Sequence, residues 1–215
     1  VFFKELLGML GLNFITDYKS ELKDVKKFNK LAFPLDIALT QNCSQKDWFD
    51  QAEILKYQLT NDVINQAFSL LPVERHDEET NKIKRNLIER KNKLSEIALE
   101  YYLKMQKTPV ITGSAQSEKI VVEQGADKEL LIRIYNKTTG LLNFEKRYSP
   151  KYTKEIWLYG LGGNDEFEID KQHSKIRLLV IGGEGINNYK IDQAENVSLY
   201  ERSSEKDRLK SIEYA

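Results

Sequence analysis

The sequence is short of the residues from which most metal, redox and membrane sites are built. It contains 1 Cys and 2 His among 215 residues. Because Cys43 stands alone, an intrachain disulfide and any multi-thiolate zinc or iron-sulfur site are excluded. His76 and His173 are far apart along the chain, so a two-histidine metal site has no local signature. No run approaches the roughly 18 consecutive apolar residues of a membrane span, and we expect no transmembrane segment in this chain.

Neither sign of charge is in excess, since the chain contains 33 basic and 33 acidic residues. A chain without net charge has no overall electrostatic field that would attract phosphates or anionic lipid. We therefore expect no nucleic acid partner. Hydrophobic residues make up 40% and charged residues 31% of the chain, which is typical of a globular polypeptide. The first residue is Val1, and no basic start or cleavage site of a secretory signal follows it. We therefore expect a fragment whose partners are covalently attached domains of a larger parent protein.

Two regions are indicated by a change of hydrophobic period near Thr108 and Pro109. We expect a helical region over residues 1–107 and a β-rich region over residues 108–215, which together give an α+β fold class. Ser44 and Asp47 form a capping-box pattern that predicts a helix over about 45–58. Thr60 is a plausible N-cap for a second helix that ends before Pro72. A third, longer helix is predicted over about 79–106, with a restart after a kink near Ser95.

The β-rich region contains short runs of β-branched and aromatic residues that predict strands separated by turn residues. A hairpin with antiparallel strands is predicted around residues 136–140, where Gly140 can take positive φ. These features favour a small sandwich or a short solenoid-like sheet. The predicted strands are 120–122, 130–135, 141–148, 156–159, 176–181 and 197–200.

A repeat of 22 residues is the most informative pattern in the chain. It aligns Gly160 with Gly182, Gly163 with Gly185, Asp165 with Asn187, Phe167 with Tyr189 and Ile169 with Ile191. Each copy reads as a glycine turn, an acidic or amide residue, and a strand whose large apolar residues point inward.

These two copies resemble the glycine-rich calcium repeat of RTX proteins, in which Gly-Gly-x-Gly-x-Asp is followed by an apolar residue. The match is partial, because Asn187 replaces the Asp in one copy and Leu161 replaces a Gly in the other. The resemblance implies a calcium site as a metal-binding hypothesis, while a purely structural turn is the favoured alternative. The metal-site residues are then Asp165, Gly160, Gly163, Gly182, Gly185 and Asn187, with oxygen ligands from carboxylate, amide and backbone carbonyl groups.

A wider resemblance covers most of the chain, over the segments 59–72, 83–102, 110–123 and 155–163. These segments are similar to a region of bacterial envelope proteins that accompanies a calcineurin-like metallophosphoesterase domain or a surface-antigen-type outer-membrane barrel. The resemblance implies a periplasmic or outer-membrane-associated location, and it implies no chemistry for this chain. The His-bearing segments that a two-metal phosphoesterase requires are missing.

Other chemistry is weighed against simpler structural roles. His76 with the acidic residues 77–79 precedes a predicted helix, whose positive N-terminal end these acids favour. Glu166, Glu168 and Asp170 share one face of a predicted strand, and we expect that face to meet solvent. Ser114 lacks a Gly-x-Ser-x-Gly elbow and reads as a turn serine.

The sequence thus favours a non-catalytic accessory or connecting region of a larger cell-envelope protein, and we assign no catalytic residue and no cofactor other than the calcium hypothesis. One alternative is a hydrolase whose acids are Asp165 with Glu166 or Glu168. Another is a ligand- or partner-binding module, which would show an exposed apolar patch or groove.

Overall fold

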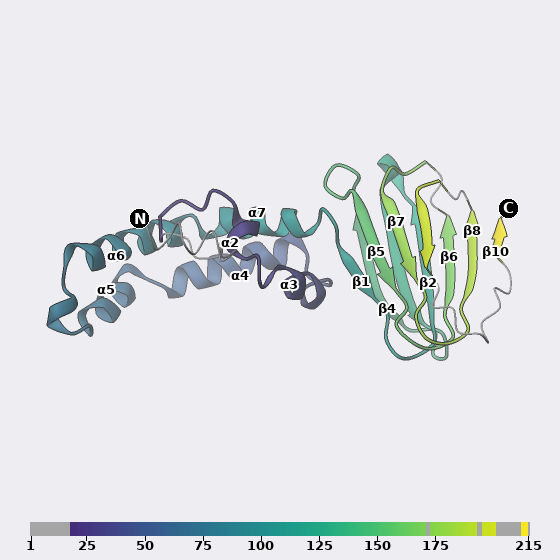
Figure 1. Ribbon diagram of the computed structural model, residues 1–215, viewed down its shortest axis with the longest axis horizontal. Helices are drawn as coiled ribbons and strands as arrows, with labels where there is room; N and C mark the ends of the chain where they lie inside the picture. The colour runs from purple at the N-terminus through teal and green to yellow at the C-terminus, as the bar shows by residue number, and fades with distance from the viewer. Residues whose placement is uncertain (1–17, 171–172, 193–194, 201–211, 215) are drawn as a thin grey trace, which may run out of the picture. The chain divides into compact units, whose positions relative to one another are not determined.

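A computed structural model of the protein describes residues 18–170, 173–192, 195–200 and 212–214. Six α-helices precede the strands in these described parts of the chain, and the strands form two sheets, so the predicted α+β class is confirmed (Figure 1). Two compact units divide the chain. The helical unit draws on Val1–Pro34 and Cys43–Lys104, whereas the β unit draws on Leu35–Asn42 and Met105–Ala215. The short segment Leu35–Asn42 therefore belongs with the strands, although it lies early in the sequence.

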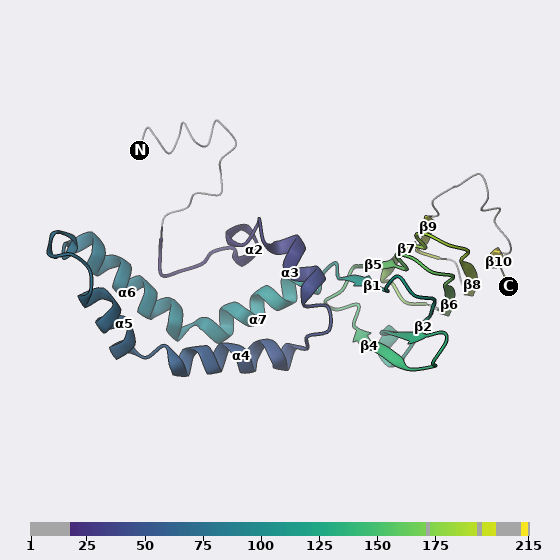
Figure 2. The same cartoon turned by 90° about the horizontal axis from the view of Figure 1, so that it is seen from below.

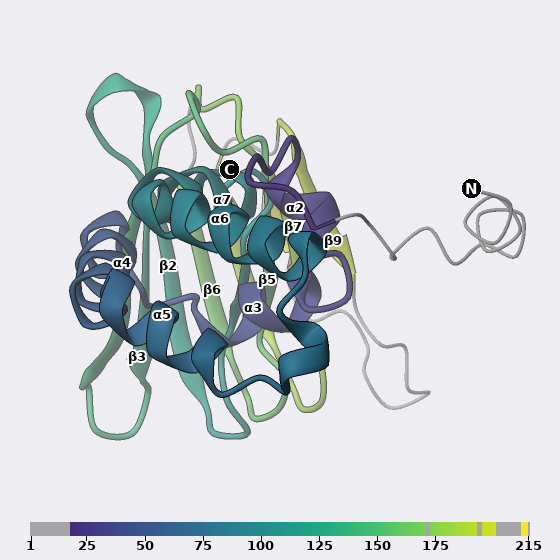
Figure 3. The same ribbon diagram turned by 90° about the vertical axis from the view of Figure 1, so that its left-hand side faces the viewer.

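The helical unit is built on two rows of helices, in which α4 and α5 lie beside α6 and α7 (Figures 2 and 3). The Ser95 hydroxyl donates a hydrogen bond to Glu53 Oε1, and Trp48 packs edge-on against Tyr101 with ring centroids 5.8 Å apart. The helices are α2 Val25–Phe28, α3 Phe33–Leu39, α4 Gln45–Gln58, α5 Asn61–Ser69, α6 Glu78–Asn92 and α7 Leu94–Met105, with a short 3-10 turn at Val73–Arg75.

The helix starts follow the capping chemistry of the sequence. Ser44 and Asp47 make the reciprocal bonds of a capping box at α4, and the Thr60 hydroxyl accepts from the Val63 amide at α5. The long helix predicted over 79–106 is divided at Lys93, where α6 ends and α7 begins, close to the predicted restart. Asp77 caps α6, which supports the structural interpretation of the acidic residues after His76.

The β unit contains a four-stranded and a six-stranded sheet, seen as two layers in Figure 2. The four-stranded sheet has the order β1-β5-β7-β9 and is parallel throughout. The six-stranded sheet has the order β10-β8-β6-β2-β3-β4. The strands are β1 Val110–Thr112, β2 Glu118–Gln124, β3 Leu130–Asn136, β4 Leu142–Tyr148, β5 Glu155–Tyr159, β6 Glu166–Asp170, β7 Arg177–Ile181, β8 Asn188–Asp192, β9 Val197–Tyr200 and β10 Ile212–Tyr214, with a 3-10 turn at Ala126–Lys128.

Successive strands alternate between the two sheets, so the chain winds as a short parallel solenoid. One rung consists of a strand in the four-stranded sheet, a turn, and a strand in the six-stranded sheet: β1–β2, then β5–β6, then β7–β8. The 22-residue repeat predicted from the sequence is the rung length, since Phe167 pairs with Tyr189 and Ile169 pairs with Ile191. Phe167 and Tyr189 stack with ring centroids 5.0 Å apart.

The hairpin of β3 and β4 is inserted between the first two rungs. Both of its strand pairings, β2 with β3 and β3 with β4, are antiparallel, as the sequence predicts for the turn at 136–140. Asn136 holds this turn by accepting the Thr138 and Thr139 amides on its side-chain oxygen.

The main core lies between the two sheets. Alternate residues of each strand point inward, and Ile120, Ile156, Phe167, Leu178 and Val180 are buried there. Within the part of the chain that the structure describes, no helix is long and apolar enough to cross a membrane, which agrees with the expected lack of a transmembrane segment.

Candidate functional site at the glycine turns

The two glycine turns predicted from the sequence connect β5 to β6 and β7 to β8, and they stack on each other along the solenoid. The residue that closes each turn points inward and bonds to the neighbouring rung. Asp165 Oδ1 accepts the Glu118 amide at 2.9 Å, and Asn187 Oδ1 accepts the Asp165 amide at 3.0 Å. We call Glu118, Asp165 and Asn187 the polar ladder. Asp165 and Asn187 each satisfy the backbone amide of the ladder member in the neighbouring rung, which would otherwise lack a partner.

Glycine is required beside the ladder because the backbones and carboxyl groups approach closely. A Cβ on Gly160 would lie 2.3 Å from the Gly182 carbonyl oxygen and 2.4 Å from Asp165 Oδ2. A Cβ on Gly185, which has φ of +108°, would lie 1.8 Å from the Gly163 carbonyl oxygen. The glycines of the 22-residue repeat therefore provide the space in which the ladder and the next rung fit.

Asp165 is the member of the ladder whose pKa is strongly shifted. Its side chain is fully buried, and burial raises its pKa from 3.8 to about 6. The hydrogen bond from the Glu118 amide lowers that pKa, while the nearby Glu118 charge raises it further. Asp165 Oδ2 and Asn187 Nδ2 both lack a hydrogen-bond partner. A buried acceptor and a buried donor are thus left unused in adjacent rungs.

The predicted calcium residues are gathered in one place, since the Gly182 carbonyl and Asp165 Oδ2 both face the space above Gly160. Two of the side-chain oxygens that could bind calcium already accept hydrogen bonds, because Asp165 Oδ1 and Asn187 Oδ1 each accept a backbone amide. Within the described residues, no group of three or more His, Cys, Asp or Glu side chains is arranged to hold a metal ion. Calcium would depend on carbonyl oxygens for most of its 6 to 8 ligands, and its binding here stays a prediction.

The carboxylates of the hydrolase alternative point in different directions. Asp165 is buried in the turn before β6, while Glu166 and Glu168 are partly exposed on the outer face of β6. Glu168 pairs with Lys119 at 2.8 Å and with Lys190 at 3.2 Å, and the hydrogen bonds from these lysines lower its pKa. The Glu168 carboxylate is held as an ion-paired anion.

Two other sequence candidates have structural roles. His76 is exposed, and its Nε2 lies 2.9 Å from the Leu71 carbonyl oxygen. Ser114 donates its hydroxyl hydrogen bond to Glu118 Oε1, and its amide donates to Glu118 Oε2 at 3.1 Å. Ser114 therefore completes the turn between β1 and β2, as the sequence analysis predicts for a turn serine.

Glu118, the first member of the ladder, is not among the site residues predicted from the sequence. Glu118 lies 47 residues before Asp165, whereas Asp165 and Asn187 are 22 residues apart, because the β3–β4 hairpin interrupts the repeat. The signal was present. Gly113 precedes Glu118 by the same interval that separates Gly160 from Asp165, and a Cβ on Gly113 would lie 2.6 Å from Glu118 Oε2.

Comparisons with protein family models, curated proteins and solved structures find no match to this chain.

Proposed function

We propose that this chain is a non-catalytic accessory region of a larger cell-envelope protein, periplasmic or associated with the outer membrane, that connects and positions the domains attached to it. The observation that supports this role is a difference between the two outer faces of the solenoid. One face carries large apolar side chains that suit contact with protein, and the other is charged over β6 and β8 and suits water.

The outer face of the four-stranded sheet carries large apolar side chains, with an ion pair between Glu155 and Arg177 at one end of β5 and β7. Trp157 pairs with Leu179, and Tyr159 pairs with Ile181, so large side chains form two columns across the strands. These four side chains are partly exposed, although the residues between them point into the core. Strands that are apolar on both sides are typical of sheets with both faces covered.

The outer face of the six-stranded sheet has the opposite character. Its outward residues on β6 and β8 are Glu166, Glu168, Asp170, Asn188, Lys190 and Asp192. Lys190 bridges Glu166 at 3.3 Å and Glu168 at 3.2 Å. Exposed pairs of this kind add little stability, but they keep the face solvated. This contrast supports a module whose four-stranded sheet is covered by a neighbouring domain and whose six-stranded sheet faces solvent.

A test of this role changes the apolar columns without touching the core. In the full-length parent protein, Trp157→Ser with Leu179→Ser should leave the fold intact and increase proteolytic cleavage between this region and its neighbours. Glu168→Ser with Lys190→Ser on the charged face is the matched control. Equal cleavage in both variants would contradict a positioning role for the apolar face.

The rival hydrolase is tested on the purified chain with chromogenic phosphoester and glycoside substrates. We expect no turnover above that of a denatured sample. Turnover that disappears in Glu168→Gln, while Asp192→Asn keeps it, would replace the accessory role with an enzymatic one.

Calcium binding is a second candidate function, supported by the unpartnered and buried Asp165 Oδ2. A ligand that binds only the folded state raises the melting temperature as its concentration increases. If the glycine turns bind calcium, millimolar calcium should raise the melting temperature of the native chain, and Asp165→Asn should abolish that increase. An unchanged melting curve in the native chain would leave the turns with a structural role alone.

A further inference from the structure

Among the residues that the structure describes, β1 is the edge strand of the four-stranded sheet, and half of its backbone groups have no strand beside them. The Pro109 carbonyl accepts the Trp157 amide at 3.0 Å, and the Gly113 amide donates to the Tyr159 carbonyl at 2.7 Å. Because alternate residues of a parallel strand bond to the same neighbour, Ile111 faces β5. The amide and carbonyl groups of Val110 and Thr112 therefore point away from β5, toward the open edge.

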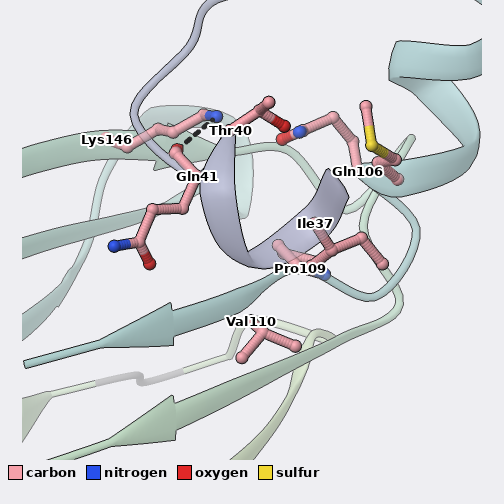
Figure 4. A pocket seen from close by; sticks show the side chains of 8 residues that line it. Ile37, Thr40, Gln41, Gln106, Pro109, Val110 and Lys146 are labelled. Carbon is pink, nitrogen blue, oxygen red and sulfur yellow. Dashed lines mark hydrogen bonds between the residues drawn. The ribbon is translucent and has the colours of Figure 1, made fainter. Parts of the chain in front are cut away.

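The segment Leu35–Asn42 of the β unit, which we call the strap, covers this edge. Gln41 Oε1 accepts the Thr112 amide at 3.1 Å, and Gln41 Nε2 donates to Thr112 Oγ1 at 3.3 Å. A side-chain amide thus takes the position of a neighbouring strand. Lys146 of β4 donates to the Gln41 carbonyl oxygen at 3.0 Å and ties the strap to the other sheet (Figure 4).

The strap is held by few apolar contacts. Helix α3, which forms most of it, has no buried residue, and Leu35 and Leu39 are 59% and 72% exposed. Ile37 faces a small pocket beside Pro109 and Val110 (Figure 4). Segments with few buried apolar contacts open at low cost, without global unfolding. Opening of the strap would expose the Thr112 amide to solvent.

We propose that Gln41 is a removable cap, and that the uncapped β1 edge pairs in antiparallel fashion with the β1 edge of a second copy of this chain. An unprotected strand edge is a template for pairing with another chain. A twofold axis would bring Val110 of each copy opposite Thr112 of the other, so the edge is self-complementary.

A second copy fits this edge better than a free peptide does. The edge offers the backbone groups of only two residues, and a flexible peptide would lose much of that small gain to its own ordering. Two preformed sheets lose little conformational freedom when they join. The paired edges would also extend the apolar outer face formed by Trp157 and Leu179 across both copies.

The proposal is tested with Gln41→Ala, which removes both side-chain bonds to Thr112. Sedimentation over a wide range of protein concentration should show a monomer for the native chain and a concentration-dependent dimer for the variant. Gln41→Glu keeps an oxygen that can accept the Thr112 amide, so it should remain monomeric. Gln51→Ala removes an exposed glutamine from α4 and should also remain monomeric. A Gln41→Ala variant that stays monomeric at every concentration overturns the proposal.

A second change locates the interface. Val110→Pro, added to Gln41→Ala, removes an edge amide at the first residue of β1, where proline is tolerated because that amide does not face β5. The double variant should return to a monomer with the circular dichroism of the native chain. A dimer that persists in the double variant would place the contact elsewhere and overturn the assignment to β1.

The unmodified chain gives an independent readout through amide exchange. The Thr112 amide should exchange with solvent at least about tenfold faster than the Ile111 amide, because exposing it requires only the strap to open. Equal protection of the two amides would overturn the removable cap, whatever the variants do.

Discussion

The β unit and the helical unit bury their apolar residues to very different degrees. In the β unit, the inward positions of successive rungs form one continuous cluster that includes Ile120, Phe167 and Val180. In the helical unit, Ile64 is 1% exposed, whereas Tyr57 and Leu70 are 85% and 86% exposed. The helices therefore depend more on caps and local bonds, while the solenoid depends on how closely its backbones stack.

This comparison can be measured separately in each unit, because the chain contains 2 Trp. Trp48 lies in α4 of the helical unit, and Trp157 lies in β5 of the β unit. A Trp48→Phe background leaves Trp157 as the fluorescent reporter of the β unit. A Trp157→Phe background leaves Trp48 as the reporter of the helical unit.

The largest effect is expected from Gly185→Ala in the β unit. The added Cβ would lie 1.8 Å from the Gly163 carbonyl oxygen, at a residue whose φ is +108°. Relieving this overlap requires two rungs to separate, so we expect a loss of about 3 kcal/mol or more in the free energy of unfolding. Urea unfolding followed by Trp157 fluorescence measures it.

Gly140→Ala is the matched control for that loss. Gly140 also has positive φ, at +71°, but nothing lies within 4 Å of its added Cβ. We expect a loss of about 1 kcal/mol from backbone strain alone. If the two alanine variants lose equal stability, close stacking of the rungs does not limit the β unit.

The next effect is a pH dependence that originates at Asp165. Because its pKa is raised to about 6 in the folded state, the folded chain holds this proton more tightly than the unfolded chain. The stabilisation is fully present below pH ~4 and is lost as the pH rises through ~6. Asp165→Asn keeps an oxygen for the Glu118 amide and carries no charge, so at pH 8 it should be more stable than the native chain by up to about 3 kcal/mol.

Urea unfolding at several pH values between 4 and 8, with Trp157 as the reporter, checks this expectation. The native chain should lose stability across that range, and Asp165→Asn should lose less. Asp192→Asn, an exposed change at the end of β8, should follow the native chain. A variant at position 165 that keeps the native pH dependence would show that another group is responsible.

Leu161 offers a smaller effect in the opposite direction. It adopts φ of +74° and is 49% exposed, whereas its counterpart in the next rung is Gly183 with φ of +94°. Leu161→Gly relieves the left-handed strain but adds freedom to the unfolded chain, so we expect a net gain of roughly 0.5–1 kcal/mol. The urea midpoint reported by Trp157 should rise. Leu141→Gly, at an exposed leucine without positive φ, should lower that midpoint, and a fall for both would reject strain at Leu161.

The same contrast explains what the sequence could predict. Caps at Ser44 and Thr60 and the hairpin at Asn136 are local signals, and each was readable within a few residues. The equivalence of Phe167 and Tyr189, and the inward direction of both, could be predicted because the repeat has a constant interval of 22 residues.

Contacts that join distant segments left a weaker signal or none. The bond between Gln41 and Thr112 spans 71 residues, and neither residue has a pattern that marks the other. The ladder bond between Glu118 and Asp165 crosses an inserted hairpin, and only the glycine five residues before each of them relates the two. Solvent exposure of one face of a strand is likewise a property of the assembled sheet. The outer column of Trp157 and Leu179 is therefore defined by the strand register and not by the sequence of either strand.

An effect close in size to that at Leu161 is expected from Ser44→Ala in the helical unit. The Ser44 hydroxyl accepts the Asp47 amide at 3.2 Å, and Asp47 Oδ2 accepts the Ser44 amide at 2.6 Å, at the exposed start of α4. Removing the hydroxyl leaves an N-terminal amide of the helix to water, which typically costs about 1 kcal/mol. Because the cap is exposed, no core residue moves, and the Trp48 reporter should show a lower urea midpoint.

Ser69→Ala is the control for this loss. Ser69, at the end of α5, has a hydroxyl that donates to the Gln66 carbonyl and caps no helix start. This variant should be neutral, since alanine is a better helix former. A loss for Ser69→Ala as large as that for Ser44→Ala would mean that the helical unit does not depend on its caps.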